Sequence, residues 1–152
     1  MKKEETVDYH IKACWHSIAR MYNQKAMQED ITTSIGFVLI NINSSEGTPA
    51  TKIAPMMGLE SRSLTRMLKT MEEKGLIVKK PDLQDKRSVR VFLTEEGKRK
   101  KAISVETIKQ FNKQVRDKLS QDEFKAFFVI FEKINQVVNH VHEQIDKPQN
   151  QL

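Results

Sequence analysis

Apolar residues recur along the start of the chain at the spacing of one helix face. Intervals of four, three, four and three residues separate them, which predicts a helix over residues 4–27. The residues of this stripe are Val7, Ile11, Cys14, Ile18 and Met21, widened by Trp15 and Tyr22. Residues 33–43 are apolar almost throughout, which predicts a second helix in the centre of the fold.

The middle of the chain has turn-forming and capping residues in the order of a helix-turn-helix followed by a hairpin. Residues 44–49 are rich in turn formers, Thr51 is placed to cap a short helix through residue 57, and Gly58 supplies a turn. A longer helix over residues 60–74 is expected to end at Gly75. Two β-prone runs, residues 76–78 and 89–93, are separated by the turn formers Pro81, Asp82, Asp85 and Ser88. This order predicts a winged helix.

The longer helix has two chemically different sides. Leu64, Met67, Leu68 and Met71 fall on one side, and the other carries mostly polar and cationic residues. These are Arg62, Ser63, Arg66, Lys69 and Thr70. Arginine can donate two parallel hydrogen bonds to guanine, and hydroxyls can serve phosphate or base, so this side suits a major groove. A solvated basic surface is the alternative, and the helix, turn, helix and hairpin order favours the groove.

The hairpin tip is basic, with Lys86 and Arg87 next to Asp85. A carboxylate two residues from a guanidinium can pair with it and restrict its rotamers, and a restricted arginine loses less entropy on entering a narrow minor groove. An ordinary exposed loop with an incidental ion pair remains the alternative.

Charge, cysteine content and motifs limit the remaining possibilities. The 152 residues suit a single domain, and 26 Lys and Arg against 20 Asp and Glu favour an anionic partner. The start MKKEETVDYH lacks the apolar run of a signal peptide, and no stretch approaches the length of a membrane span, so a cytoplasmic protein without a membrane role is expected. The four histidines show no metal-ligand or nucleophile spacing, and no Gly-rich phosphate loop is present. We therefore expect no enzyme activity, no metal and no cofactor.

The wing sequence resembles the MarR family of bacterial transcriptional regulators. DKRSVRVFLTEEG resembles the family pattern of Asp, any residue, Arg, a short strand and Leu-Thr-x-x-Gly, here Asp85, Arg87, Leu93, Thr94 and Gly97. SLTRMLKTMEEKGLI resembles the recognition helix of the family, in which Ser63, Thr65 and Arg66 occupy positions that face DNA. ARMYNQKA in the first helix is also similar. The specific resemblance covers residues 51–97, with Pro55 as a departure from the pattern.

This resemblance implies a mainly α fold with a small β-hairpin wing, and a homodimer that binds double-stranded DNA. The winged helix-turn-helix would span residues 30–97, and the dimerisation helices residues 4–27 and 98–146. Sequence pattern supports the C-terminal helices independently, because Thr94 can cap one helix and Ser120 with Glu123 forms a capping box for the next. The last helix has an apolar seam of Phe124, Phe127, Phe131, Ile134, Val138, Val141 and Ile145. Packing against the preceding helix of the same chain is the alternative use of this seam.

By resemblance, the regulator is expected to repress transcription and to leave an inverted-repeat operator when a small amphipathic or phenolic effector binds. The candidate effector-binding residues are His10, Trp15, Phe37 and Met57, which are apolar or titratable and lie on segments expected to converge. Ordinary core packing of these residues is the alternative.

Two further alternatives concern the function. Some relatives sense hydroperoxides through one cysteine in the first helix, and Cys14 has Tyr9 and Tyr22 nearby in sequence. The position of Cys14 on the apolar stripe instead favours an inert core thiol. An adaptor that kept the winged helix but binds a partner protein is the other alternative.

Duplex binding separates the DNA-binding regulator from the adaptor. Replacing Arg87 with alanine should weaken binding of duplex DNA at least about fivefold, roughly 1 kcal/mol, because one groove or phosphate contact is lost. An adaptor would bind duplex weakly and with the same affinity after the substitution, as measured by fluorescence anisotropy.

Overall fold

The computed structural model describes residues 2–83, 85 and 88–146. Within them, six α-helices, a short 3-10 turn and a three-stranded sheet confirm a mainly α fold with a small β wing. The elements are η1 (Lys3–Glu5), α1 (Val7–Met27), α2 (Thr33–Asn41), β1 (Thr48–Pro49), α3 (Ala50–Met56), α4 (Ser61–Glu73), β2 (Ile77–Pro81), β3 (Val89–Leu93), α5 (Glu95–Lys118) and α6 (Gln121–Asp146). The chain divides into two compact units, Met1–Lys109 and Gln110–Leu152. The predicted domain limits stay a prediction.

The sheet contains one strand more than the predicted hairpin. Its order is β1-β3-β2 and both pairings are antiparallel, with Thr48 opposite Val91 and Pro81 opposite Val89. β1 has only two residues and lies in the segment predicted as a turn, so it carries no alternating pattern to detect. Strand β2 extends through Pro81, which was predicted to lie in the turn. Proline is tolerated there because β2 is an edge strand.

Helix α3 begins two residues before the predicted start, because its cap is residue 49 and not residue 51. Pro49 is its N-cap residue, with φ −59° and ψ 133°, and makes no side-chain capping hydrogen bond. Thr51 lies inside the helix, so the prediction that it caps α3 is wrong. The fixed φ of proline already directs the chain into the first turn of the helix. Pro55 lies within α3, near its C-terminal end.

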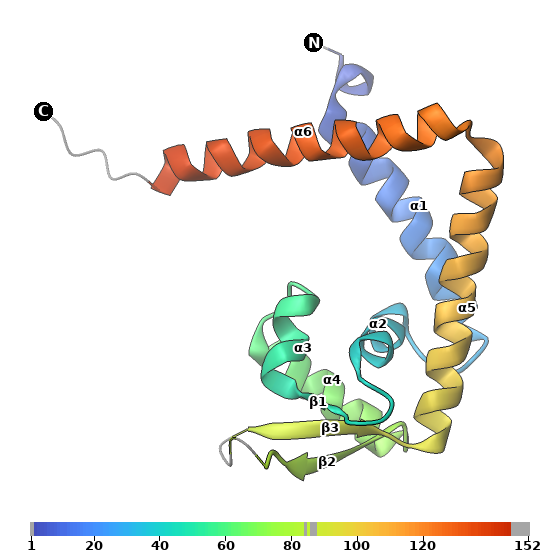
Figure 1. Cartoon of the computed structure of the whole chain (residues 1–152), viewed down its shortest axis with the longest axis vertical. Coiled ribbons are helices and arrows are strands. Elements are labelled where there is room, and N and C mark those ends of the chain that lie inside the picture. The colour runs from blue at the N-terminus through green and yellow to red at the C-terminus, as the bar shows by residue number, and fades with distance from the viewer. Residues whose placement is uncertain (1, 84, 86–87, 147–152) are drawn as a thin grey trace, which may run out of the picture. The chain divides into compact units, whose positions relative to one another are not determined.

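The core of the first unit lies between α2, α3, α4 and the sheet, with the helices on one side of the sheet (Figure 1). Leu39, Ile53 and Met71 are fully buried, and each contributes about 1.5–3 kcal/mol by leaving water. The predicted central position of the second helix is confirmed, since four residues of α2 are buried.

The junction between α4 and α5 is built around Thr94. Its hydroxyl donates to the Gly75 carbonyl at 2.6 Å and accepts from the Gly97 N–H at 3.0 Å, which confirms Thr94 as the helix cap. A Cβ at Gly97 would lie 2.0 Å from the Leu76 carbonyl oxygen, so only glycine fits this turn of α5. The Leu-Thr-x-x-Gly pattern thus joins the wing to α5 through backbone contacts.

The linker between α1 and α2 is held from two sides by lysines. Lys100 of α5, only 8% exposed, donates to the Glu29 carbonyl and pairs with the Glu29 carboxylate at 3.1 Å. Lys74, the C-cap residue of α4, donates to the Asp30 carbonyl at 3.1 Å and pairs with its carboxylate at 3.0 Å. The hydrogen bond from Lys100 lowers the pKa of Glu29.

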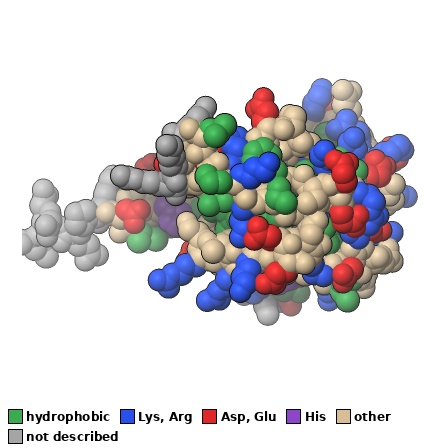
Figure 2. All heavy atoms as spheres, turned by 90° about the horizontal axis from the view of Figure 1, so that it is seen from below, with side chains coloured by type: hydrophobic (Ala, Val, Ile, Leu, Met, Phe, Trp, Pro, Cys, Tyr) green, Lys and Arg blue, Asp and Glu red, His purple; other side chains and the backbone are tan. Residues whose placement is uncertain are grey.

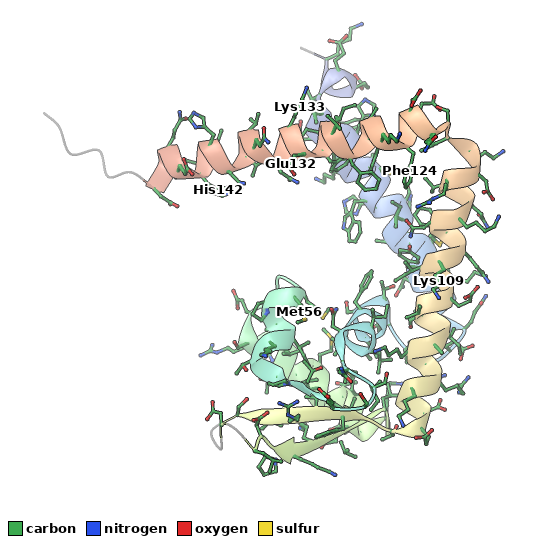
Figure 3. All side chains as sticks on the ribbon, in the orientation of Figure 1. Met56, Lys109, Phe124, Glu132, Lys133 and His142 are labelled. Atoms are coloured by element: carbon green, nitrogen blue, oxygen red, sulfur yellow. The ribbon has the colours of Figure 1, made fainter. Side chains whose placement is uncertain are left out.

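The second unit contains the end of α5 and all of α6. Its predicted capping box is confirmed, because the Ser120 N–H donates to the Glu123 carboxylate at 2.8 Å and the Glu123 N–H donates to the Ser120 hydroxyl at 3.2 Å. The Ser120 N–H, and after it the Ser120 hydroxyl, lower the pKa of the Glu123 carboxyl. Phe124 begins the apolar side of α6 (Figure 3) and stacks edge-on with Phe128.

The apolar surface of α6 is exposed and wider than the predicted seam. Phe127, Val138, Val141 and Ile145 of the seam are 46–72% exposed. Phe128, Ile130 and Val137, which lie beside the seam at 100° per residue, are 55–64% exposed. No residue of α6 is buried. A soluble chain rarely leaves so long an apolar strip in water, so this strip has the character of an interface.

Candidate nucleic-acid interface

Helix α4 presents its polar side to solvent because its other side is buried. Leu64, Leu68 and Met71 are 0–5% exposed and pack into the core. Their spacing places the remaining positions of the helix in water. The predicted DNA-contacting residues of this helix are all exposed, namely Arg62, Ser63, Thr65, Arg66 and Lys69.

The cations of α4 are largely unneutralised. Among the residues that the structure describes, Arg62 and Arg66 have no acidic partner within 4 Å. Lys69 is 4.0 Å from Glu73, and both side chains are strongly exposed, so this pair is weak. The two guanidinium groups therefore keep their charge and hydrogen-bond donors available for phosphate or base edges.

The hydroxyl of Thr65 is already used inside the helix. It donates to the Ser61 carbonyl at 2.8 Å, so it can only accept a further hydrogen bond, and its methyl group can contact apolar atoms. Thr65 thus differs from the arginines in what it can offer a nucleic acid.

The wing follows α4 as strands β2 and β3. Asp85 is exposed, its N–H donates to the Asp82 carboxylate at 3.1 Å, and its carbonyl accepts from the Ser88 N–H at 2.8 Å. Lys86 and Arg87 lie outside the described residues, and the predicted pairing of Arg87 with Asp85 lies there too.

A buried ion pair at the base of the wing was not predicted. Arg90 Nε donates to Asp82 Oδ2 at 2.8 Å, and Asp82 is only 3% exposed. Arg90 Nη1 also donates to the carbonyls of Glu46 and Gly47, at 3.1 and 3.4 Å, in the loop before β1. The pair fastens the wing to the loop that precedes β1. A carboxylate and a guanidinium at the two ends of one hairpin were the available sequence signal.

The side of the molecule that Figure 2 shows carries lysine and arginine side chains with acidic and hydrophobic ones among them. In β2, Lys79 is neutralised by Glu72 at 2.7 Å, and the Lys80 ammonium lies 5.3 Å from the Phe92 ring centre. Among the cations of α4 and β2, Arg62, Arg66 and Lys80 have no acidic partner within 4 Å in the described part of the chain.

A hollow of about 660 Å³ lies between α1, α2 and α3. Of the candidate effector-binding residues, Trp15, Phe37 and Met57 line it together. His10 does not line it, because its Nε2 lies 2.7 Å from the Glu4 carbonyl and its ring stacks edge-on against Tyr9. Met56, labelled in Figure 3, is 59% exposed and also lines the hollow.

The hollow has a cationic side that the sequence analysis missed. His16 and Arg20 line it, whereas no aspartate or glutamate does within the described residues. His16, Arg20 and Asn23 recur on one helix face at intervals of four and three, a signal that was present in the sequence. Apolar and cationic walls in one hollow fit an amphipathic anion better than a neutral or cationic molecule.

Helix α1 has no buried residue, and Cys14 is exposed. The prediction of a core position for Cys14 is therefore wrong for the single chain. Val7 and Trp15 of the same stripe are 58% and 54% exposed. The stripe exists as predicted, but its first half is exposed, whereas Ile18, Met21 and Tyr22 are half-buried and Tyr22 stacks edge-on with Phe37 of α2.

Comparison with known proteins places these features in one family. A sequence model of the MarR family matches residues 31–89. The organic hydroperoxide resistance transcriptional regulator of Bacillus subtilis is 30% identical over 139 residues, which cover 90% of this chain and 94% of that protein. The chain belongs to the MarR family. It is a DNA-binding transcriptional regulator, and the members of this family are not enzymes.

Other relatives agree with this assignment. The HTH-type transcriptional regulator SarZ of Staphylococcus aureus is 31% identical over 104 residues, which cover 66% of this chain and 70% of SarZ. The crystal structure of the S. aureus MepR-DNA complex matches with a TM-score of 0.80 at 22% identity, over 87% of this chain and 98% of that one. The PcaV regulator of Streptomyces coelicolor, in complex with its natural ligand, matches with a TM-score of 0.75 at 20% identity, over 91% of this chain and 97% of PcaV. The two structural matches confirm the winged-helix fold.

None of the helices in the described part of the chain has the length and apolar character needed to cross a membrane.

Proposed function

We propose that this MarR-family protein is a homodimeric repressor that binds an inverted-repeat operator in the cytoplasm and leaves it when a small amphipathic anion binds. The observation that carries the proposal is the polar side of α4, where Arg62 and Arg66 are exposed and unneutralised among the described residues. The exposed Ser63, Thr65 and Lys69 complete the contact set on this helix. Asp85, Lys86 and Arg87 are the proposed contacts of the wing.

Dimerisation is supported by apolar surface that one chain leaves in water. The stripe of α1 and the strip of α6 contain ten large apolar side chains that are at least 36% exposed. The apolar side of α6 spans more of the helix circumference than the seam of a two-stranded coiled coil, which favours contact with more than one helix. A second copy of the chain supplies such helices, and its two-fold symmetry explains why the operator should be an inverted repeat.

Two recognition helices related by a two-fold axis fit successive major grooves about 34 Å apart. The MepR-DNA complex shows that a protein of this fold binds DNA. The structural match therefore supports the binding mode, and the operator has to be found by selection.

Selection from a random-sequence duplex pool should enrich an inverted repeat with half-site centres about one helical turn apart. Arg66→Ala should weaken binding of the selected duplex by about 1–3 kcal/mol and reduce the slope of log affinity against log salt by about one, because one cation is removed. Fluorescence anisotropy over a salt series measures both quantities.

The matched control for that experiment is Lys113→Ala, which removes an exposed cation of α5 that pairs with Asp117. It should change neither the affinity nor the slope.

Sedimentation velocity should give twice the chain mass of 17.7 kDa at micromolar concentration. A monomer at this concentration, or no enriched duplex at low ionic strength, would contradict the proposal.

The hollow lined by Trp15, Phe37 and Met57 is the proposed effector site, with Arg20 as the cationic partner and His16 as a hydrogen-bonding neighbour. Its volume lies in the range of small-ligand sites. The hollow borders α3, so a ligand there would contact the helix that precedes the recognition helix. The ligand-bound PcaV structure shows that a protein of this fold takes a ligand.

Salicylate, a phenolic anion, should quench the fluorescence of Trp15, the single tryptophan of the chain, and should release the selected duplex. Arg20→Gln should raise the salicylate concentration needed for both effects about tenfold, because a charge-assisted hydrogen bond is lost. Lys12→Gln, at an exposed position of the same helix, is the matched control and should behave as wild type. If the Arg20 variant and the wild type respond at the same salicylate concentration, Arg20 does not bind the effector.

Oxidant sensing by Cys14 is a second candidate trigger. Cys14 is exposed in the single chain, and the 30% identical relative is an organic hydroperoxide resistance transcriptional regulator. A thiolate that reduces a hydroperoxide to an alcohol becomes a sulfenic acid, which adds a polar oxygen to the apolar stripe of α1.

Treatment with cumene hydroperoxide should weaken operator binding by the wild-type protein and leave Cys14→Ser unchanged, with recovery after addition of dithiothreitol. Thiol titration follows the oxidation, and anisotropy follows the binding. Unchanged operator affinity of fully oxidised wild-type protein would exclude this trigger.

A further inference from the structure

Three apolar side chains at the end of the wing remain in water. Leu83 is 95% exposed, Val89 is 40% exposed, and Pro81 is also exposed. Pro81 and Val89 are opposite each other as the last pair of the β2 and β3 ladder, and Leu83 follows two residues after Pro81. We call these three residues the apolar tip.

A single exposed leucine is ordinary on a protein surface, but the backbone that carries Leu83 is restrained. The preceding residue, Asp82, is 3% exposed and accepts hydrogen bonds from Arg90 Nε at 2.8 Å and from the Asp85 N–H at 3.1 Å. The Asp82 N–H also donates to the Ser88 carbonyl at 3.0 Å. Leu83 is therefore held outward by a fixed neighbour, and its contact with a partner costs little backbone entropy.

The size and surroundings of the apolar tip favour a nucleic-acid groove over a protein partner. Three side chains are too few for a stable protein interface, which buries about 800 Å² per partner. The tip belongs to the same hairpin as the exposed Lys80 and follows the cationic helix α4. A minor groove has walls of apolar deoxyribose C–H groups between rows of phosphate, and leucine and proline are among the side chains that enter it.

We propose that Leu83, in the hairpin that also exposes Pro81 and Val89, contacts the deoxyribose walls of the minor groove when the wing binds the operator. This contact rests on the proposed duplex binding and extends it. It supplies affinity by removing apolar surface from water, so its contribution does not depend on the release of counterions. The Asp82 and Arg90 pair positions the contact by fixing the base of the tip.

Leu83→Ser should weaken binding of the selected duplex roughly three- to tenfold and leave the slope of log affinity against log salt unchanged. Leu83→Met, which keeps an apolar side chain of similar volume, should bind like wild type. Arg66→Ala, in contrast, should lower the slope. Because Leu83 is 95% exposed, the serine variant should unfold at the wild-type urea concentration, which separates a lost contact from a lost fold.

Hydroxyl-radical cleavage gives a second readout, since the radical attacks deoxyribose hydrogens that face the minor groove. Wild type and Leu83→Met should protect two short tracts of deoxyribose, related by the two-fold axis of the operator. Leu83→Ser should lose this protection. It should still protect the major-groove guanines from methylation by dimethyl sulfate. Wild-type affinity and footprint in the serine variant would overturn the contact, as would a change confined to self-association in sedimentation. If the wild-type protein selects no duplex at all, the proposed function fails before this inference is reached.

Discussion

The burial of one side of α4 determines what the regulator can present to DNA. Leu64, Leu68 and Met71 fix the rotation of the helix about its axis, because turning it would expose all three. The outward position of Arg62 and Arg66 is thus a consequence of core packing. The same hydrophobic contacts that stabilise the lobe also give its cations a defined direction, which is what a groove of fixed shape requires.

The wing depends on a different kind of constraint. It has few apolar contacts with the core beyond Ile77, Val91 and Leu93, and its base is held by the buried Asp82 carboxylate and Arg90. A partly buried ion pair adds little net stability when its desolvation is counted, but it selects one geometry over others. Helix α4 is therefore oriented by packing and the wing by directed hydrogen bonds.

Sequence pattern predicted the helices that have a clear apolar period and two of the three helix caps. The helical spacing of α1, α2 and α4, the Thr94 cap and the Ser120 capping box all depend on residues within one or two turns of each other, and the structure confirms them. Strand β1 has only two residues, which is too short for a period, so the sequence pattern did not predict it. Thr51 has the side chain of a helix cap, but Pro49 two residues earlier already starts α3.

The candidate site shows the same division between local and long-range information. The exposure of the α4 residues follows from periodicity. The convergence of Trp15, Phe37 and Met57, the exclusion of His10 and the contribution of Arg20 depend on how α1 meets α2 and α3, which no local pattern encodes. The wrong prediction that Cys14 lies in the core has a related cause. An apolar stripe predicts a face that becomes buried, but it does not tell which molecule buries that face.

Two lysines connect the linker between α1 and α2 to α4 and α5. Lys74 caps the C-terminal end of α4 and Lys100 lies in the second turn of α5, and they donate to adjacent backbone carbonyls, those of Asp30 and Glu29. Asp30 has a left-handed φ of 53°, a backbone conformation that few non-glycine residues adopt. The two lysine contacts therefore tie adjacent residues of the linker to the C-terminal end of α4 and to α5, so a displacement of the linker has to carry or break both.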